Sequence, residues 1–181
     1  GEKMESHLGT ILFLTVGNKN GAMWNNGNLF SSSDGSSWTF RKSNIEKNFM
    51  GVTFDNSLFL IVGEDGTILT SSDGSSWDNR ASGTSNNLWG VTYGNSTFVA
   101  VGSGGTILTS SDGTSWTSRT SGVSGNLNGV TYYNTFVAVG NSGTILTSSD
   151  GTSWTSRTSG TSNSLDGDIT YGNSLFVATG D

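Results

Sequence analysis

Short apolar clusters recur along the chain, each bounded by Gly, Asn or Ser. Residues 98–101 contain no polar position, which predicts a strand that is covered on both faces. A second cluster follows at 106–110, and a mostly polar piece at 116–119 ends in Arg119, as expected for an edge strand that faces solvent. With the piece at 90–93, this stretch predicts four short strands joined by tight turns.

The four-strand pattern is repeated along the sequence. Residues 105–122 recur letter for letter at 143–160, and looser copies lie at 66–83 and 27–44. The period is 39, 39 and 38 residues, measured between the turn aspartates Asp34, Asp73, Asp112 and Asp150. Repeats of this length are typical of solenoids and propellers. A buried second strand and a polar fourth strand favour an all-β propeller whose four-stranded antiparallel blades stack face to face.

We expect one propeller domain over residues 1–181, with four to five blades. The repeats are a diverged first blade at 1–44, then 45–83, 84–122 and 123–160, and a half blade at 161–181. Two arrangements stay open. In one, residues 2–8 form a degenerate first strand of a chain of four and a half blades. In the other, residues 168–171 complete the first blade and close a four-bladed ring, which leaves the strand at 175–179 without a blade. Because both arrangements leave an incomplete blade or an extra strand, we expect either a longer propeller or a partner that completes the half blade.

Each hairpin between the third and fourth strands carries the pattern Ser-x-Asp-Gly-x-x-Trp. It resembles the Asp-box (BNR-type) repeat of β-propellers, with one residue fewer between Asp and Trp. The resemblance covers nearly the whole chain. It implies that the aspartate accepts backbone N–H bonds within the turn while the tryptophan packs under it. The structural residues assigned in this way are Asp34, Trp38, Asp73, Trp77, Asp112, Trp116, Asp150 and Trp154.

We expect no catalytic residue, cofactor or metal, because the residues that could carry enzymatic chemistry do not form the constellations that it needs. A sialidase-like glycoside hydrolase, the remote alternative that the resemblance suggests, needs converging arginines. All four arginines instead share one repeat position, on the outer strand. The only histidine, His7, lies in the N-terminal segment, and there is no cysteine. The carboxylates at 64–65 and at 166–168 are interpreted as turn residues rather than calcium ligands.

Charge and composition narrow the range of partners. The formal net charge is −6 and only 12% of residues are charged, which disfavours binding to nucleic acid. No apolar run is long enough for membrane insertion. Cysteine-free, lysine-poor repeats rich in Ser, Thr, Gly and Asn resemble those of bacterial surface proteins and phage tail or fibre adhesins. We therefore expect an extracellular, cell-surface or virion location.

The two ends of the blades differ in how much they vary. The turns after strands one and three are nearly constant, whereas the residue before each Gly-Val-Thr or its equivalent changes from blade to blade. One turn on the variable end, within 18–26, also carries extra residues. Positions that differ between near-identical blades are free of the fold or selected for a ligand. The candidate ligand-binding residues are Met23, Trp24, Met50, Trp89, Asn128 and Asp166.

These observations predict a non-enzymatic binding or adhesion propeller that recognises a surface glycan or a protein through its variable face. Exposed tryptophans are frequent platforms for sugar rings and for protein contacts. A simpler interpretation of Trp89 is that it fills the space between blades near the axis. The alternative function is that of a structural or assembly module whose half blade is completed by strand exchange with itself or another chain.

Overall fold

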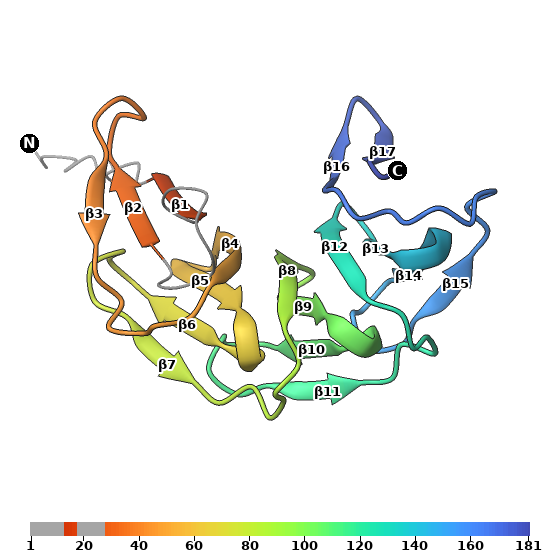
Figure 1. Ribbon diagram of the computed structural model, residues 1–181, viewed down its shortest axis with the longest axis horizontal. Coiled ribbons are helices and arrows are strands. Elements are labelled where there is room, and N and C mark those ends of the chain that lie inside the picture. The colour runs from red at the N-terminus through yellow and green to blue at the C-terminus, as the bar shows by residue number, and fades with distance from the viewer. Residues whose placement is uncertain (1–12, 18–27) are drawn as a thin grey trace, which may run out of the picture.

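The computed structural model describes residues 13–17 and 28–181, and these form five antiparallel sheets that follow one another along an open arc (Figure 1). The first sheet has three strands, β1 (Phe13–Gly17), β2 (Asn28–Ser32) and β3 (Thr39–Arg41). The second has β4 (Phe49–Asp55), β5 (Leu58–Gly63), β6 (Ile68–Ser71) and β7 (Asp78–Arg80). This architecture is the predicted all-β propeller pattern.

The remaining strands repeat the second sheet. The third sheet has β8 (Leu88–Gly94), β9 (Thr97–Gly102), β10 (Ile107–Ser110) and β11 (Thr117–Arg119). The fourth has β12 (Leu127–Tyr132), β13 (Phe136–Gly140), β14 (Thr144–Ser148) and β15 (Thr155–Arg157). The fifth is a hairpin of β16 (Ile169–Gly172) and β17 (Leu175–Ala178). Each sheet lies within one repeat of the sequence, and within each sheet the strands pair in chain order.

The first strand of each complete sheet runs along the inner side of the arc, and the last strand along its outer side (Figure 1). Inner strands β4 and β8 approach so closely that a Cβ added at Gly51 would lie 3.1 Å from the backbone oxygen of Trp89. A Cβ at Gly90 would likewise lie 3.4 Å from the Cα of Gly129 on β12. The glycine of the repeated Gly-Val-Thr therefore lets neighbouring inner strands pack backbone to backbone.

The core lies between sheets rather than within one of them. Leu60 and Val62 of β5 pack against Phe98 and Ala100 of β9, and the opposite face of β9 packs in the same way on the fourth sheet. Residues 98–101 are all fully buried, which confirms the prediction of a second strand covered on both faces. Stability therefore depends on sheet-to-sheet stacking, as expected for repeat proteins.

The Ser-x-Asp-Gly-x-x-Trp turns have the hydrogen bonds that the sequence predicts for their aspartates. Asp112 Oδ1 accepts from the backbone N–H of Thr114 at 2.8 Å and of Ser115 at 3.0 Å, while Ser110 Oγ accepts from the N–H of Gly113 at 2.8 Å. These donors lower the pKa of the Asp112 carboxyl well below its ordinary range. The same carboxylate and serine bonds recur at Asp34, Asp73 and Asp150.

The tryptophans of these turns are held less uniformly. Trp38, Trp116 and Trp154 each donate Nε1–H to the carbonyl of the turn glycine at 2.9–3.1 Å. Trp77 packs against the core between the first and second sheets, but its buried Nε1 has no hydrogen-bond partner. The carboxylate bonds are thus present in all four turns, whereas the indole bond is present in three.

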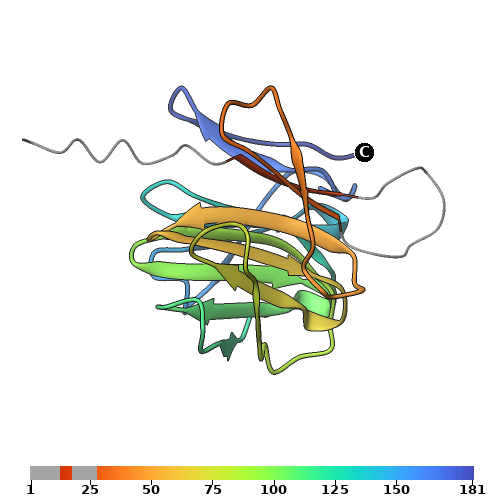
Figure 2. The ribbon, with the colours of Figure 1, turned by 90° about the vertical axis from the view of Figure 1, so that its left-hand side faces the viewer.

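Over residues 13–17 and 28–181, the ends of the arc do not close into a ring. Within the described residues, β16 pairs with β17 only, so the arrangement in which 168–171 completes the first blade is wrong. Figures 1 and 2 place the first sheet and the β16–β17 hairpin at the same end of the molecule, on opposite sides of the open part of the arc. Strand β17 is accordingly exposed, unlike β5, β9 and β13. Residues 2–8, expected as a degenerate strand, lie outside the described residues.

Candidate functional site

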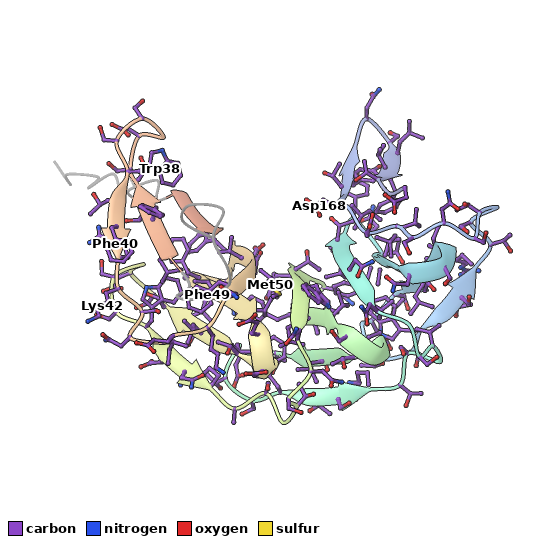
Figure 3. All side chains as sticks on the ribbon, viewed as in Figure 1. Trp38, Phe40, Lys42, Phe49, Met50 and Asp168 are labelled. Atoms are coloured by element: carbon purple, nitrogen blue, oxygen red, sulfur yellow. The ribbon has the colours of Figure 1, made fainter. Side chains whose placement is uncertain are left out.

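A cavity of about 560 Å³, called the axial cavity below, lies on the inner side of the arc, between the inner strands of neighbouring sheets. Its walls are β4, β8, β12 and the segment that leads into β16. Met50, Trp89, Asn128, Asp166 and Asp168 all line it. Figure 3 shows Met50 and Asp168 facing the same space from opposite sides of the arc. The inner strands thus bring together residues that are about 40 positions apart in sequence.

Three of these residues occupy the same unusual place in their sheets. The register of the first two strands shifts between Phe49 and Gly51, and the shift recurs around Trp89 and around Asn128. Met50, Trp89 and Asn128 are therefore bulge residues without a direct partner on the second strand. A bulge redirects a side chain and frees it from cross-strand packing. This explains why the position can vary between blades whose other residues are nearly identical.

Hydrogen bonds fix two of the bulge side chains. Trp89 Nε1–H donates to Ser103 Oγ at 3.0 Å, and Asn128 Nδ2–H donates to Asn141 Oδ1 at 3.0 Å. Ser103 and Asn141 each begin a single 3-10 turn, η2 (Ser103–Gly105) and η3 (Asn141–Gly143). The second nitrogen proton of Asn128 reaches the carbonyl of Leu165 at 3.1 Å. The turn after the second strand therefore holds the bulge residue of its own sheet in place.

The second sheet uses its equivalent turn differently. Glu64 begins η1 (Glu64–Gly66) and accepts from the backbone N–H of Asn48 at 3.1 Å and from Asn48 Nδ2 at 2.8 Å. Its carboxylate is thereby directed to the start of β4 rather than to the bulge. Met50, half-buried, contributes an unbranched thioether side chain to the wall of the cavity. Such side chains adapt readily to different ligands.

The cavity combines apolar surface on one side with negative charge on the other. Trp89 and Met50 form the apolar part, while the exposed Asp166 and Asp168 lie at the far wall. Among the residues that line it, none is lysine or arginine. Asp168 Oδ1 accepts the N–H of Ile169 at 2.8 Å, which holds that carboxylate at the start of β16. The site favours a ligand with apolar and cationic groups.

The outcome of the site prediction is mixed. Four of the six predicted residues line this one cavity, whereas Met23 and Trp24 lie outside the described residues. Met50, Trp89 and Asn128 do not lie on connections between sheets. They lie within β4, β8 and β12, half-buried, because the bulge places them at the inner edge of each sheet. Asp166 alone is exposed on a connection.

The sequence did not single out Asp168 as a binding residue. It was interpreted as a solvated turn carboxylate, and only the curvature of the arc brings it opposite Met50. The signal that the sequence offered was the position of Asp168 two residues after Asp166. Glu64 and Asp65, considered with it, are engaged in the fold, since Asp65 forms an ion pair with Lys47 at 2.5 Å. Over 13–17 and 28–181, no group of three His, Cys, Asp or Glu residues is arranged to hold a metal ion.

The arginines serve the outer strands. Arg119 Nε–H donates to Thr109 Oγ1 at 2.8 Å across the β10–β11 pair, and Arg80 and Arg157 bond in the same way to the threonine of the neighbouring strand. They therefore do not converge on the axial cavity. Two hollows of about 750 and 530 Å³ lie beside Arg80 and Arg119, at equivalent places in two repeats.

In the part of the chain that the structure describes, no helix is long and apolar enough to cross a membrane.

Comparison with known proteins identifies the fold. No protein-family model and no curated protein matches the sequence. Among solved structures, the chain is similar to YCF48 bound to a D1 peptide, with a TM-score of 0.61 and 23% identity over 80% of this chain and 50% of that one. It is also similar to YCF48 from Cyanidioschyzon merolae, with a TM-score of 0.58 and 20% identity over 80% of this chain and 55% of that one. The chain thus spans about half the length of these proteins and shares their β-propeller fold.

Proposed function

We propose that the protein is a non-enzymatic binding propeller that takes up an extended segment of a partner protein in the axial cavity. The observation that carries this proposal is the gathering of the variable bulge residues Met50, Trp89 and Asn128 in one cavity. Residues that are needed only for blade geometry are repeated from one blade to the next, whereas these three residues differ between blades. A half-buried tryptophan on one wall and two carboxylates on the opposite wall suit a peptide with an apolar and a basic side chain.

The structural neighbours support a protein ligand. One YCF48 structure contains a bound D1 peptide, so a propeller of this kind accommodates a peptide. The acidic wall formed by Asp166 and Asp168, together with the formal net charge of −6, would attract a basic segment. A surface glycan stays a prediction, as does a location outside the cell. Among the described residues that line the cavity, glycan binding would rest on Trp89, since sugar rings stack on aromatic faces.

Peptide selection followed by calorimetry tests the proposal. Phage-displayed random peptides are selected on the immobilised chain, and the best peptide is titrated into the wild type and into Trp89→Asn. This change gives β8 the residue that β12 carries at its bulge, which preserves the fold while removing the indole. We expect affinity to fall about tenfold or more, because truncating a central aromatic costs about 2 kcal/mol. A matched control, Thr117→Ala on the exposed outer strand β11, should leave affinity unchanged.

A second variant examines the charged wall. Asp168→Asn should weaken binding of a basic peptide and reduce the dependence of affinity on salt, because one screened attraction is lost. If selection yields no peptide while a glycan array binds the wild type and not Trp89→Asn, the ligand is a sugar. Equal peptide affinity in Trp89→Asn and Thr117→Ala would place the site elsewhere on the molecule.

A further inference from the structure

The hairpin that joins β12 to β13 departs from the repeat. In the second, third and fifth sheets the corresponding turn is Asn-Ser, and the residue before it is Asp55, Gly94 or Gly172. The hairpin of the fourth sheet is one residue shorter and has Tyr133 at this position. The backbone N–H of Tyr133 donates to the carbonyl of Thr135 at 3.0 Å, which fixes the residue in its turn. The other sheets fold without an aromatic residue here, so Tyr133 is an addition that blade geometry does not require.

This addition changes how the next inner strand packs. A Cβ added at Gly94 would lie 2.0 Å from Cγ of Tyr132, so the ring of Tyr132 lies directly on the Gly94 backbone. At the following junction Tyr133 takes the place of that glycine, and Tyr171 holds the repeat position of Tyr132. The rings of Tyr133 and Tyr171 stack, with centroids 3.7 Å apart and planes that differ by 12°. The other close ring pairs among the described residues are tilted or edge to face.

Contacts away from the rings hold the strand that carries Tyr171. Strand β16 lies beside β12 (Figure 1), where a Cβ added at Gly129 would lie 3.4 Å from Ile169 Cγ2. The side chain of Ile169 is buried against Val137 and Val139 of β13. The stacked rings therefore join two neighbouring inner strands whose relative position is set by the core.

Solvent reaches the stacked pair from the side of Tyr133. This residue is 48% exposed although the third sheet and β16 lie on either side of the fourth sheet, and Tyr171 is half-buried. Tyr133 follows the last residue of β12, whereas the bulge residue Asn128 lies near the start of that strand. Neither tyrosine lines the axial cavity. A reagent in solution therefore meets these phenols without entering the axial cavity.

We propose that Tyr133 and Tyr171 are an oxidative cross-linking site, at which a peroxidase that uses hydrogen peroxide joins the two rings. Each phenol gives up one electron and one proton and becomes a phenoxyl radical. The radicals couple through a carbon ortho to each oxygen, and the hydrogen on each of these carbons then moves to the oxygen, which restores two phenols. The two electrons and two protons reduce one hydrogen peroxide to two waters. Because the rings are already in contact, the radicals need no diffusion to meet, and the exposed side chain of Tyr133 can turn to align the two carbons.

The new carbon–carbon bond would tie the β16–β17 hairpin to the fourth sheet. It closes a loop between two sheets that otherwise share only non-covalent contacts, and such a loop restricts the unfolded chain. The proposal is independent of ligand binding, since the site and the axial cavity share no residue.

Treatment of the dilute chain with peroxidase and hydrogen peroxide, followed by tryptic mapping, tests the proposal. Cleavage after Arg119 and Arg157 places Tyr133 in the peptide 120–157 and Tyr171 in the peptide 158–181. We expect a monomeric product that has lost two hydrogen atoms, has the fluorescence of dityrosine and links these two peptides. Tyr133→Phe and Tyr171→Phe should each lose the link, because phenylalanine has no phenol to oxidise while its ring preserves the packing.

Two further variants serve as matched controls. Tyr93→Phe changes the tyrosine of the third sheet that is equivalent to Tyr171 and whose ring lies 4.5 Å from that of Phe98. Tyr132→Phe changes the neighbour of Tyr133 within the same tryptic peptide. Both should form the link as the wild type does. An unchanged link in Tyr133→Phe would contradict the assignment, as would a wild type that forms links only between chains, only to the peptide 81–119 that contains Tyr93, or not at all.

Discussion

Replacing equivalent phenylalanines inside and at the end of the arc measures how much one sheet stabilises the next. Phe98 on β9 and Phe176 on β17 share a repeat position and a local partner, since their rings lie 4.5 Å from Tyr93 and 4.8 Å from Tyr171. They differ in how much of the ring the neighbouring sheets bury. Phe98 is fully buried and Phe176 is 37% exposed.

The burial of the two rings sets the expected magnitudes. Phe98→Ala removes a fully buried ring between two sheets and should lower the free energy of unfolding by about 3–5 kcal/mol. Phe176→Ala leaves a gap open to solvent rather than a closed cavity, so about 1–2 kcal/mol is expected. Urea unfolding followed by tryptophan fluorescence gives both values by linear extrapolation. Equal losses in the two variants would refute the view that stacking between sheets dominates stability.

Three further predictions concern the turns and the close-packed backbone. Backbone N–H donors lower the pKa of Asp112, so the stability that its carboxylate contributes is complete above the ordinary pKa of about 4 and is lost as pH falls through the lowered pKa. The melting temperature of Asp112→Asn should therefore change less between neutral and acidic pH than that of the wild type. Gly102→Ala should destabilise the fold by more than about 2 kcal/mol in urea unfolding, because its Cβ would lie 2.1 Å from a backbone oxygen, whereas Gly122→Ala, at φ 77° with open space around it, should cost about 1 kcal/mol. Trp77→Phe removes a buried N–H without a partner and should be neutral or stabilising in thermal melts, while Trp116→Phe breaks a hydrogen bond and should cost about 1 kcal/mol.

Much of the fold could be predicted because the same local sequence pattern occurs in several repeats. The apolar run at 98–101 required two covered faces, and the structure provides them. The Ser-x-Asp-Gly-x-x-Trp turns needed only local hydrogen bonds, which depend on neighbouring residues and so follow directly from sequence. The ring closure could not be decided in this way, because it depends on the rotation between sheets, which no local pattern encodes.

The sequence selected the candidate residues, and the structure shows that four of them line one cavity. Variation between near-identical blades identified Met50, Trp89, Asn128 and Asp166. The first three are bulge positions, which are released from the constraints that keep the rest of the repeat constant. That Met50, Trp89 and Asn128 lie half-buried within strands at the inner side of the arc follows from a register shift that the sequence does not reveal. Asp168 joins them only through the curvature of the arc.

The measurement that tests the account most directly is a crystal structure of the chain with the selected peptide bound. The account predicts density for an extended peptide in the axial cavity, with an apolar side chain against Trp89 and a basic one near Asp168. A peptide on the outer strands, or along the edge of β17, with only solvent in the axial cavity, would contradict it.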